Sequence, residues 1–188
     1  MNLTQLAQKA TNTFFHSNTS TESSIAGNDP IELLKSQHKE VDELFKQIED
    51  LSPKAYKSKQ KIFETIAKKL ELHTQIEEKV FYPATKQLDK DLILEAYEEH
   101  DVVKDLIEKI QACGPEDESF DAKICVLKEA VQHHVKEEEN ELFPETRSKF
   151  STEKLMAIGE IMKKEQSKLE QHQDHKIHRH AKKKLKRA

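Results

Sequence analysis

The chain has 188 residues, of which 35% are charged and 35% are hydrophobic, with three glycines and five prolines, and this composition favours long amphipathic helices over β-sheet. The sequence has no run of the roughly 18 apolar residues that cross a membrane, no basic and apolar leader, and too few cysteines for a disulfide framework, so a cytoplasmic protein is expected. The net charge of −4 divides into +6 for residues 172–188, with seven Lys or Arg against one Asp, and −10 for the rest, which makes the body a poor nucleic-acid binder and confines any such contact to the tail.

The chain divides into three predicted parts. Residues 1–28 are rich in Ser, Thr and Asn and form an N-terminal extension that could hold a short amphipathic helix. Residues 29–150 form a helical domain, because an Asp-Pro pair at its start is a favourable helix cap and long amphipathic patterns follow. Residues 151–188 begin with a fifth helix and continue into a basic, His-rich tail. The helices predicted within the domain cover residues 29–51, 55–87, 89–112 and 120–150, with Pro83 kinking or ending the second and residues 113–119 as the clearest loop.

One motif occurs twice in the domain: a histidine followed four residues later by a glutamate and ten residues later by a proline. A lone histidine precedes each copy on the helix before it. In chain order the six residues are His38, His73, Glu77, His100, His134 and Glu138. The lone histidines are 62 residues apart and the paired ones 61, so the chain contains a duplicated helical hairpin.

All six residues occupy positions that apolar residues fill elsewhere on the same helices. At alternating steps of three and four, the first helix reads Ile, Leu, His, Val, Phe, Ile, and the other three follow the same pattern. The stripe of the second helix continues after Glu77 through Val80 and Ala84, which are predicted to be in the core. Short connections make the helices run up, down, up and down, and at about 1.5 Å per residue the six side chains fall at a similar depth. The predicted fold is therefore an all-α, up-down-up-down four-helix bundle with the six side chains in one layer.

This layer is predicted to bind metal. A carboxylate buried without a counter-charge costs several kcal/mol, and the core stripes contain no Lys or Arg, so Glu77 and Glu138 need a cation. Imidazole nitrogen with carboxylate oxygen suits iron, manganese or zinc, and the lack of thiolate ligands disfavours copper(I) and iron–sulfur clusters. Six ligands divide naturally over two ions, and a dinuclear iron site is the best fit.

Residues 73–83 and 134–144, together with the Glu99-His100 pair, resemble the hemerythrin-like HHE cation-binding domain. The resemblance covers roughly residues 30–148, with both halves present in order. It implies a four-helix bundle around a non-haem di-iron centre bridged by an oxygen atom and two carboxylates. Carried over by position, one iron would be bound by His38 and His73 and the other by His100 and His134, with Glu77 and Glu138 as bridges.

The chain departs from the oxygen-carrying members of the family at one position. Those proteins have a fifth histidine one turn after the third ligand histidine, and this chain has Lys104 there. Each iron would then keep one open coordination position, which favours activation of an oxidant over simple oxygen transport. The residues that could refill such a position are Asp42, Glu43, Asp105, His133 and the histidines of the tail.

Polar residues beside the six ligands allow two interpretations each. His133 could pair with Glu137 in a competing register, but the proline ten residues on in both copies selects His134. Glu78 and Glu139 lie off the strict stripe, where they could hydrogen-bond a ligand histidine or form solvated salt bridges.

Other features lie further from the motifs. Tyr97, one turn before the third ligand histidine, could donate to a metal-bound species but is more often a core residue at such a position. Cys113 is interpreted as an exposed thiol with nothing nearby to activate it. The tail histidines could chelate metal, bind an anionic surface or be solvated, and they are His172, His175, His178 and His180.

Two functional hypotheses follow. The first is a cytoplasmic non-haem di-iron protein that binds and reacts with O2, hydrogen peroxide or nitric oxide, in oxidative or nitrosative stress. Peroxide disproportionation would need no partner, whereas nitric oxide or O2 reduction would need an electron donor. The second is a non-catalytic sensor of O2, redox state or iron, or an iron-holding module, in which metal occupancy orders the bundle.

Overall fold

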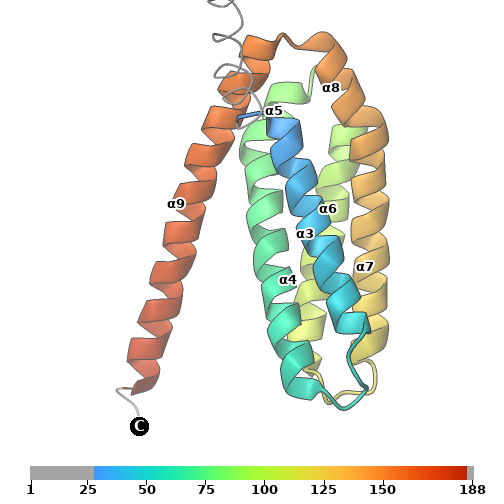
Figure 1. Ribbon diagram of the computed structural model, residues 1–188, viewed down its shortest axis with the longest axis vertical. Helices are drawn as coiled ribbons and strands as arrows, with labels where there is room; N and C mark the ends of the chain where they lie inside the picture. The colour runs from blue at the N-terminus through green and yellow to red at the C-terminus, as the bar shows by residue number, and fades with distance from the viewer. Residues whose placement is uncertain (1–27, 186–188) are drawn as a thin grey trace, which may run out of the picture.

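The computed structural model describes residues 28–185 of the chain, with side chains described through residue 172. Four helical rods run antiparallel in an up-down-up-down bundle, and a fifth helix lies outside it (Figure 1). The fold class predicted from the sequence is confirmed, while the amphipathic helix predicted in residues 1–28 lies outside the described residues. The elements are α3 (Pro30–Glu49), α4 (Tyr56–Ile76), η1 (Glu77–Phe81), α5 (Tyr82–Thr85), α6 (Lys90–Cys113), α7 (Phe120–Glu137), η2 (Glu138–Leu142), α8 (Phe143–Lys149) and α9 (Thr152–Leu185).

Capping residues that are recognisable in the sequence mark the ends of several helices. Asp29 caps α3 by accepting from the backbone N–H of Ile31 at 2.9 Å, and Pro30 follows at the first helical position, as predicted. Asp89 caps α6 in the same way. Gly114 ends α6 with a φ of 72°, a conformation that residues with a Cβ rarely adopt.

The two rods that carry the His-x3-Glu motifs each contain a π-helical turn. In the first, α4, η1 and α5 form one continuous rod, and the Tyr82 N–H donates to the Glu77 carbonyl five residues back. Pro83 lacks an N–H and its ring would crowd the carbonyl four residues earlier in an α-helix, so a wider turn accommodates it. The kink or stop predicted at Pro83 is therefore a π-turn that the helix passes through. The second rod repeats this at α7, η2 and α8.

The π-turn shifts the buried face of the first rod by one residue. The α-helical stripe predicted Val80 and Ala84 in the core, and this was wrong because both are only half-buried. Phe81, Tyr82 and Thr85 are fully buried instead. Residues five apart rather than four apart now share a face, and this change decides which side chains reach the layer of histidines.

Two apolar cores fill the bundle, one on each side of that layer. The upper core, at the end of the bundle where α5, α8 and the start of α9 meet in Figure 1, contains Ile31, Leu34, Ile76, Phe81, Tyr82, Ile93, Ala96, Leu142, Phe143, Phe150, Leu155, Ile158 and Met162. The lower core contains Val41, Phe45, Ile48, Phe63, Ile66, Ala67, Leu70, Val103, Ile110, Phe120, Ile124, Leu127 and Val131.

Helix α9 packs on the first half of the bundle, against α3, α4 and η1. It buries Leu155, Ile158 and Met162 in the upper core. Gly159 allows the close approach, because a Cβ there would lie 1.8 Å from the carbonyl oxygen of Asn28. The predicted fifth helix is thus confirmed, and its main contacts are with the first half of the bundle.

Two further expectations concern the surface. Cys113 is half-buried and donates to a backbone carbonyl at 3.4 Å, which corrects the prediction of an exposed thiol, and Cys125 is exposed. Both cysteines are free. Within residues 28–185, the helices are too short or too polar to qualify as membrane spans.

Candidate metal centre

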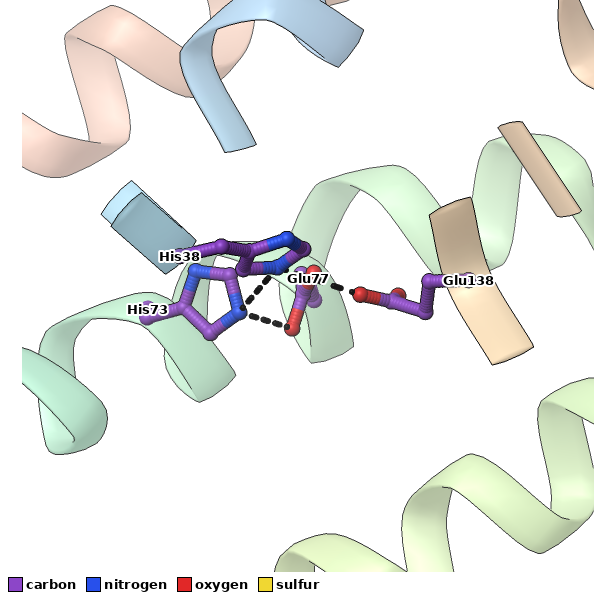
Figure 2. A group of neighbouring side chains, drawn as sticks. All are labelled: His38, His73, Glu77 and Glu138. Atoms are coloured by element: carbon purple, nitrogen blue, oxygen red, sulfur yellow. Dashed lines mark hydrogen bonds and ion pairs between the residues drawn. The ribbon is translucent and has the colours of Figure 1, made fainter. Parts of the chain in front are cut away.

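The structure brings all six predicted residues into one layer between the upper and lower cores. They come from all four rods, and the two His-x3-Glu pairs each straddle an α-to-π junction. All six are buried, with none more than 7% exposed. Figure 2 shows four of them, His38, His73, Glu77 and Glu138, pointing toward one another from α3, α4, η1 and η2.

Each histidine is oriented by a hydrogen bond from its outer ring nitrogen. The acceptors are carboxylate or amide oxygens, so each Nδ1 must carry the proton and donate it. Each Nε2 consequently points inward, as in metal-binding histidines. The four bonds run from Nδ1 of His38 to Glu139 (2.9 Å), of His73 to Gln37 (2.8 Å), of His100 to Glu78 (3.0 Å) and of His134 to Glu99 (2.8 Å).

The inward nitrogens form two pairs. Nε2 of His38 lies 3.2 Å from Nε2 of His73, and Nε2 of His100 lies 3.2 Å from Nε2 of His134. Two lone pairs at this distance repel each other unless a cation or a proton lies between them. Ligand atoms held at right angles about 2.1 Å from one ion lie about 3 Å apart, so each pair has the separation that a shared ion requires.

The two glutamates connect the two histidine pairs. Glu77 Oε2 lies 3.1 Å from Nε2 of His73 and 3.3 Å from Nε2 of His100. Glu138 Oε2 lies 3.3 Å from Nε2 of His38 and 3.6 Å from Nε2 of His134. Each carboxylate therefore faces one histidine of each pair, as a ligand bridging two ions would.

The carboxylates are incompletely satisfied by protein groups. Glu77 Oε1 and Glu138 Oε2 are buried oxygens that accept no hydrogen bond from the described part of the chain. Such groups cost free energy unless something fills their coordination. Together with the facing lone pairs, they make a donor set of nitrogen and oxygen that fits two borderline cations.

The electrostatics of the metal-free centre show an excess of buried negative charge. Burial, followed by repulsion from Glu138, raises the pKa of Glu77 well above its usual range. Burial also opposes ionisation of Glu138, but the charges of His134 and His38 lower its pKa below the usual range. Burial raises the pKa of Tyr82 as well, so its hydroxyl stays protonated in the metal-free protein. One of the two carboxylates thus lacks a positively charged partner, and a bound cation would supply that charge.

Tyr82 is a site residue that the sequence analysis missed. Its Oη lies 3.3 Å from Nε2 of both His100 and His134, donates to Glu138 Oε1 at 3.0 Å and lies 3.5 Å from Glu77 Oε2. The hydroxyl oxygen is therefore close to the place where a shared ion of the second histidine pair would lie.

The π-turn explains both the position of Tyr82 and why periodicity did not find it. Tyr82 is five residues after Glu77, which on an α-helix would turn it off the ligand face. The equivalent residue after Glu138 is Phe143, whose ring stacks on His38 at 5.9 Å. The available signal was the Tyr-Pro pair directly behind the first motif, where the second has Phe-Pro.

Tyr97 lies outside the layer of ligands. Its hydroxyl donates to the backbone carbonyl of Glu78 at 3.3 Å, and its ring contacts that of Tyr82 edge-on at 5.4 Å. Tyr97 therefore packs as a half-buried residue beside the upper core, which was the preferred sequence interpretation.

Lys104, which stands in place of the fifth histidine, and the other candidates for a refilled coordination position lie away from the centre. Lys104 bonds Glu78 at 2.9 Å and Asp101 at 3.0 Å, so it supports the acceptor of His100. His133 is 62% exposed, in keeping with the choice of His134 in the buried register. The remaining candidates whose side chains are described lie on the outside, namely Asp42 with Lys46, Glu43 with Lys39, and the exposed Asp105 and His172. The tail histidines His175, His178 and His180 lie beyond the described side chains.

A small apolar cavity adjoins the histidines on the side of the lower core. It has a volume of about 20 Å³ open to the centre of a water molecule, little more than a single water requires. Besides the four histidines, its walls are mainly aliphatic and include Val41, Leu70, Val103 and Val131. The centre is thus adjacent to a dry space for a diatomic molecule or a peroxide.

Comparison with known proteins agrees with this geometry. The sequence model of the hemerythrin HHE cation binding domain matches residues 29–146. The chain belongs to the hemerythrin HHE cation-binding domain family. It is a metal-binding, hemerythrin-like helical bundle, and its His/Glu clusters are the candidate ligands.

Two similar proteins extend the comparison. A crystal structure of a hemerythrin HHE cation binding domain-containing protein from Mycobacterium kansasii has a TM-score of 0.67 and 23% identity, covers 75% of this chain and 86% of that one, and supports the fold. A DNA nickase from Nostoc sp. (strain PCC 7120 / SAG 25.82 / UTEX 2576) is 28% identical over 141 residues, 74% of this chain. The chain spans only 40% of the nickase.

Proposed function

We propose that the protein holds two iron ions in this layer and reacts with a small oxidant: hydrogen peroxide, nitric oxide or O2. The observation that carries the proposal is the arrangement of two inward-facing nitrogen pairs, joined by two buried carboxylates, beside a small apolar cavity. Iron would supply one-electron steps and affinity for small oxygen or nitrogen species. The ligand assignment is His38 and His73 for one ion, His100 and His134 for the other, and Glu77 and Glu138 as bridges.

Tyr82 changes the count of open positions that the sequence suggested. With its Oη 3.3 Å from Nε2 of both His100 and His134, we assign it as a further ligand of their ion. In the half with His38 and His73 the matching residue is Phe143, whose side chain offers no ligand atom. That half would therefore be the one with room for a small oxidant.

The surrounding residues would orient the ligands and exclude water. Glu139, Gln37, Glu78 and Glu99 fix the four imidazole rings through their outer nitrogens. The aliphatic walls of the cavity keep water from competing with the oxidant, which strengthens every charge interaction inside. Tyr82 donates its hydroxyl hydrogen to Glu138 Oε1, 3.0 Å away, and so orients that carboxylate.

Peroxide turnover tests the proposal without an added donor, because two hydrogen peroxide molecules yield two water molecules and one O2. Iron-loaded protein should contain two irons per chain and release one O2 per two peroxides consumed. His134→Ala should lose iron and turnover together, while His172→Ala, an exposed histidine on α9, should retain both. Fully loaded wild-type protein that consumes peroxide no faster than His134→Ala would refute the peroxide reaction. Nitric oxide or O2 reduction would need an electron donor from outside the chain.

A non-catalytic sensor or iron-holding role is the second candidate, because α9 packs directly on η1. Glu77 opens η1, and Lys79 on the same turn pairs with Glu165 of α9 at 3.4 Å. Metal occupancy at Glu77 could thus change how firmly α9 is held. Limited proteolysis would separate the roles, since a sensor should show metal-dependent cleavage of α9 and slow, reversible spectral change with O2 alone.

The geometry does not support DNA nicking as the activity of this chain. The ligands are at most 7% exposed and the adjacent cavity is about 20 Å³, too small for a phosphodiester group. The acidic body would also repel DNA. Iron-loaded protein should leave supercoiled plasmid intact, and nicking that disappears in His134→Ala would contradict this conclusion. We also propose a cytoplasmic location, where the two free cysteines would stay reduced.

A further inference from the structure

A third group of potential metal ligands lies on the outside of the second half of the bundle. Nε2 of His133 lies 3.5 Å from Glu99 Oε1 and 3.4 Å from Glu137 Oε1. His133 and Glu137 are four residues apart on α7, the same spacing as in the buried motifs, and Glu99 comes from α6. His133 is 62% exposed, and both carboxylates are partly exposed, so an ion could reach this group from solvent.

The internal repeat shows that this group is specific to one half. At the offsets of 62 and 61 residues, Glu99, His133 and Glu137 correspond to Gln37, Leu72 and Ile76. Those three residues lie on the half that α9 covers, and Leu72 and Ile76 pack in the upper core. The second half has a chelating set where the first half has apolar packing, so the duplicated architecture itself does not require these polar residues.

Glu99 connects this surface group to the buried centre. Its Oε2 accepts from Nδ1 of His134 at 2.8 Å, while its Oε1 faces His133. The carboxylate is thus held in one orientation before any ion binds, which lowers the entropy lost on binding. Gln37 makes the same bond to His73 at 2.8 Å with an amide oxygen, so orienting the buried histidine does not in itself require a carboxylate.

We propose that Glu99, His133 and Glu137 form a surface site for a divalent cation of the zinc class. The Glu99 carboxylate connects this site to His134. Ligands about 2.1 Å from a tetrahedral ion lie about 3.4 Å apart, which matches the two separations from His133 Nε2. One imidazole and two carboxylates form a three-ligand set that leaves the fourth position to water. A cation here would bind the same carboxylate that orients His134, so its binding would change the hydrogen bond that holds this ligand of the buried centre. The site does not depend on which ions the buried centre holds.

Zinc binding to the full-length, metal-loaded protein tests the site. Equilibrium dialysis against Zn²⁺, with metal analysis of every sample, should show that His133→Gln and Glu137→Gln each bind one zinc per chain fewer than wild type, or bind it at least tenfold more weakly. The buried metal content, measured in the same samples, should stay unchanged. His172→Gln is the matched control, because it also removes an exposed histidine, and it should bind as wild type does.

Unchanged zinc stoichiometry and affinity in His133→Gln would overturn the proposal and leave His133 as a surface partner of the two carboxylates without a metal. Loss of zinc in His172→Gln alone would overturn it too, by placing the binding on α9. Glu99→Gln gives a second measurement: it should lose the surface zinc, because an amide replaces one of the two carboxylate ligands. A parallel loss of buried metal and zinc in Glu99→Gln, with His133→Gln unaffected, would also count against the site.

Discussion

Glutamine in place of either glutamate proposed as a bridge, Glu77 or Glu138, should have opposite effects on the metal-free protein and the same direction of effect on the metal-loaded one. Glu77 has a pKa raised by burial and by Glu138, so its ionised form destabilises the metal-free fold at any pH above its ordinary pKa. Glu138 has a lowered pKa because the charges of His134 and His38 outweigh its burial, so it contributes stability above its ordinary pKa that is lost as pH falls. At pH 7, Glu77→Gln should therefore stabilise the metal-free protein and Glu138→Gln should destabilise it.

The magnitudes follow from the burial of both side chains. Glu77 is 0% exposed and its Oε1 accepts no hydrogen bond from the described residues, so removing the charge should recover about 1–3 kcal/mol. Glu138 is 2% exposed and accepts from Tyr82, so losing its charge should cost a similar amount, about 1–3 kcal/mol. In a chain of this size 1 kcal/mol moves Tm by roughly 2–4 °C, so the two variants should differ in Tm by several degrees without metal.

Metal loading should reverse the sign of the Glu77→Gln effect. Each ion held at 100 times its Kd stabilises the folded state by about 2.7 kcal/mol, and both variants lose a bridging ligand. Both should therefore fall below wild type in Tm when iron is present. Thermal unfolding with and without chelator, alongside metal analysis, measures all six values. If Glu77→Gln lowers the metal-free Tm as much as Glu138→Gln does, the assignment of excess buried charge to Glu77 is wrong.

Four further substitutions test other parts of the structure. Tyr82→Phe should retain two irons per chain but abolish any visible phenolate-to-iron absorption, and persistence of that band would contradict the proposed ligand. Gly159→Ala should lower Tm by several degrees, because its Cβ would lie 1.8 Å from the Asn28 carbonyl oxygen, whereas wild-type stability would refute the close packing of α9. Asp121→Ala should lower the free energy of unfolding by about 1–3 kcal/mol, because it leaves the buried Lys59 ammonium without the carboxylate 2.6 Å away. Lys59→Met removes the buried charge itself and should change the free energy of unfolding by about zero. Chemical denaturation gives both values.

The sequence predicted the bundle and the six-residue layer because both depend on periodicity and repetition. The six residues fall at α-helical positions that neighbouring apolar residues also fill, and the offsets of 61 and 62 residues align the two halves. The Asp29-Pro30 start was predictable for a similar reason, since a cap depends on a few adjacent residues. Where the rod departs from α-helical geometry, beyond Glu77, the prediction of buried residues was wrong by one position.

The amino-acid sequence by itself determined which residues are buried on each α-helical face and therefore that nitrogen and oxygen donors meet in one layer. Only the tertiary structure decided that Tyr82 joins them, because a hydrogen bond closed one residue later rotates everything beyond it. It also decided that α9 covers the first half of the bundle and leaves Glu99, His133 and Glu137 open to solvent on the second. Contacts between segments far apart in the chain set these features, and such contacts leave no period in the sequence.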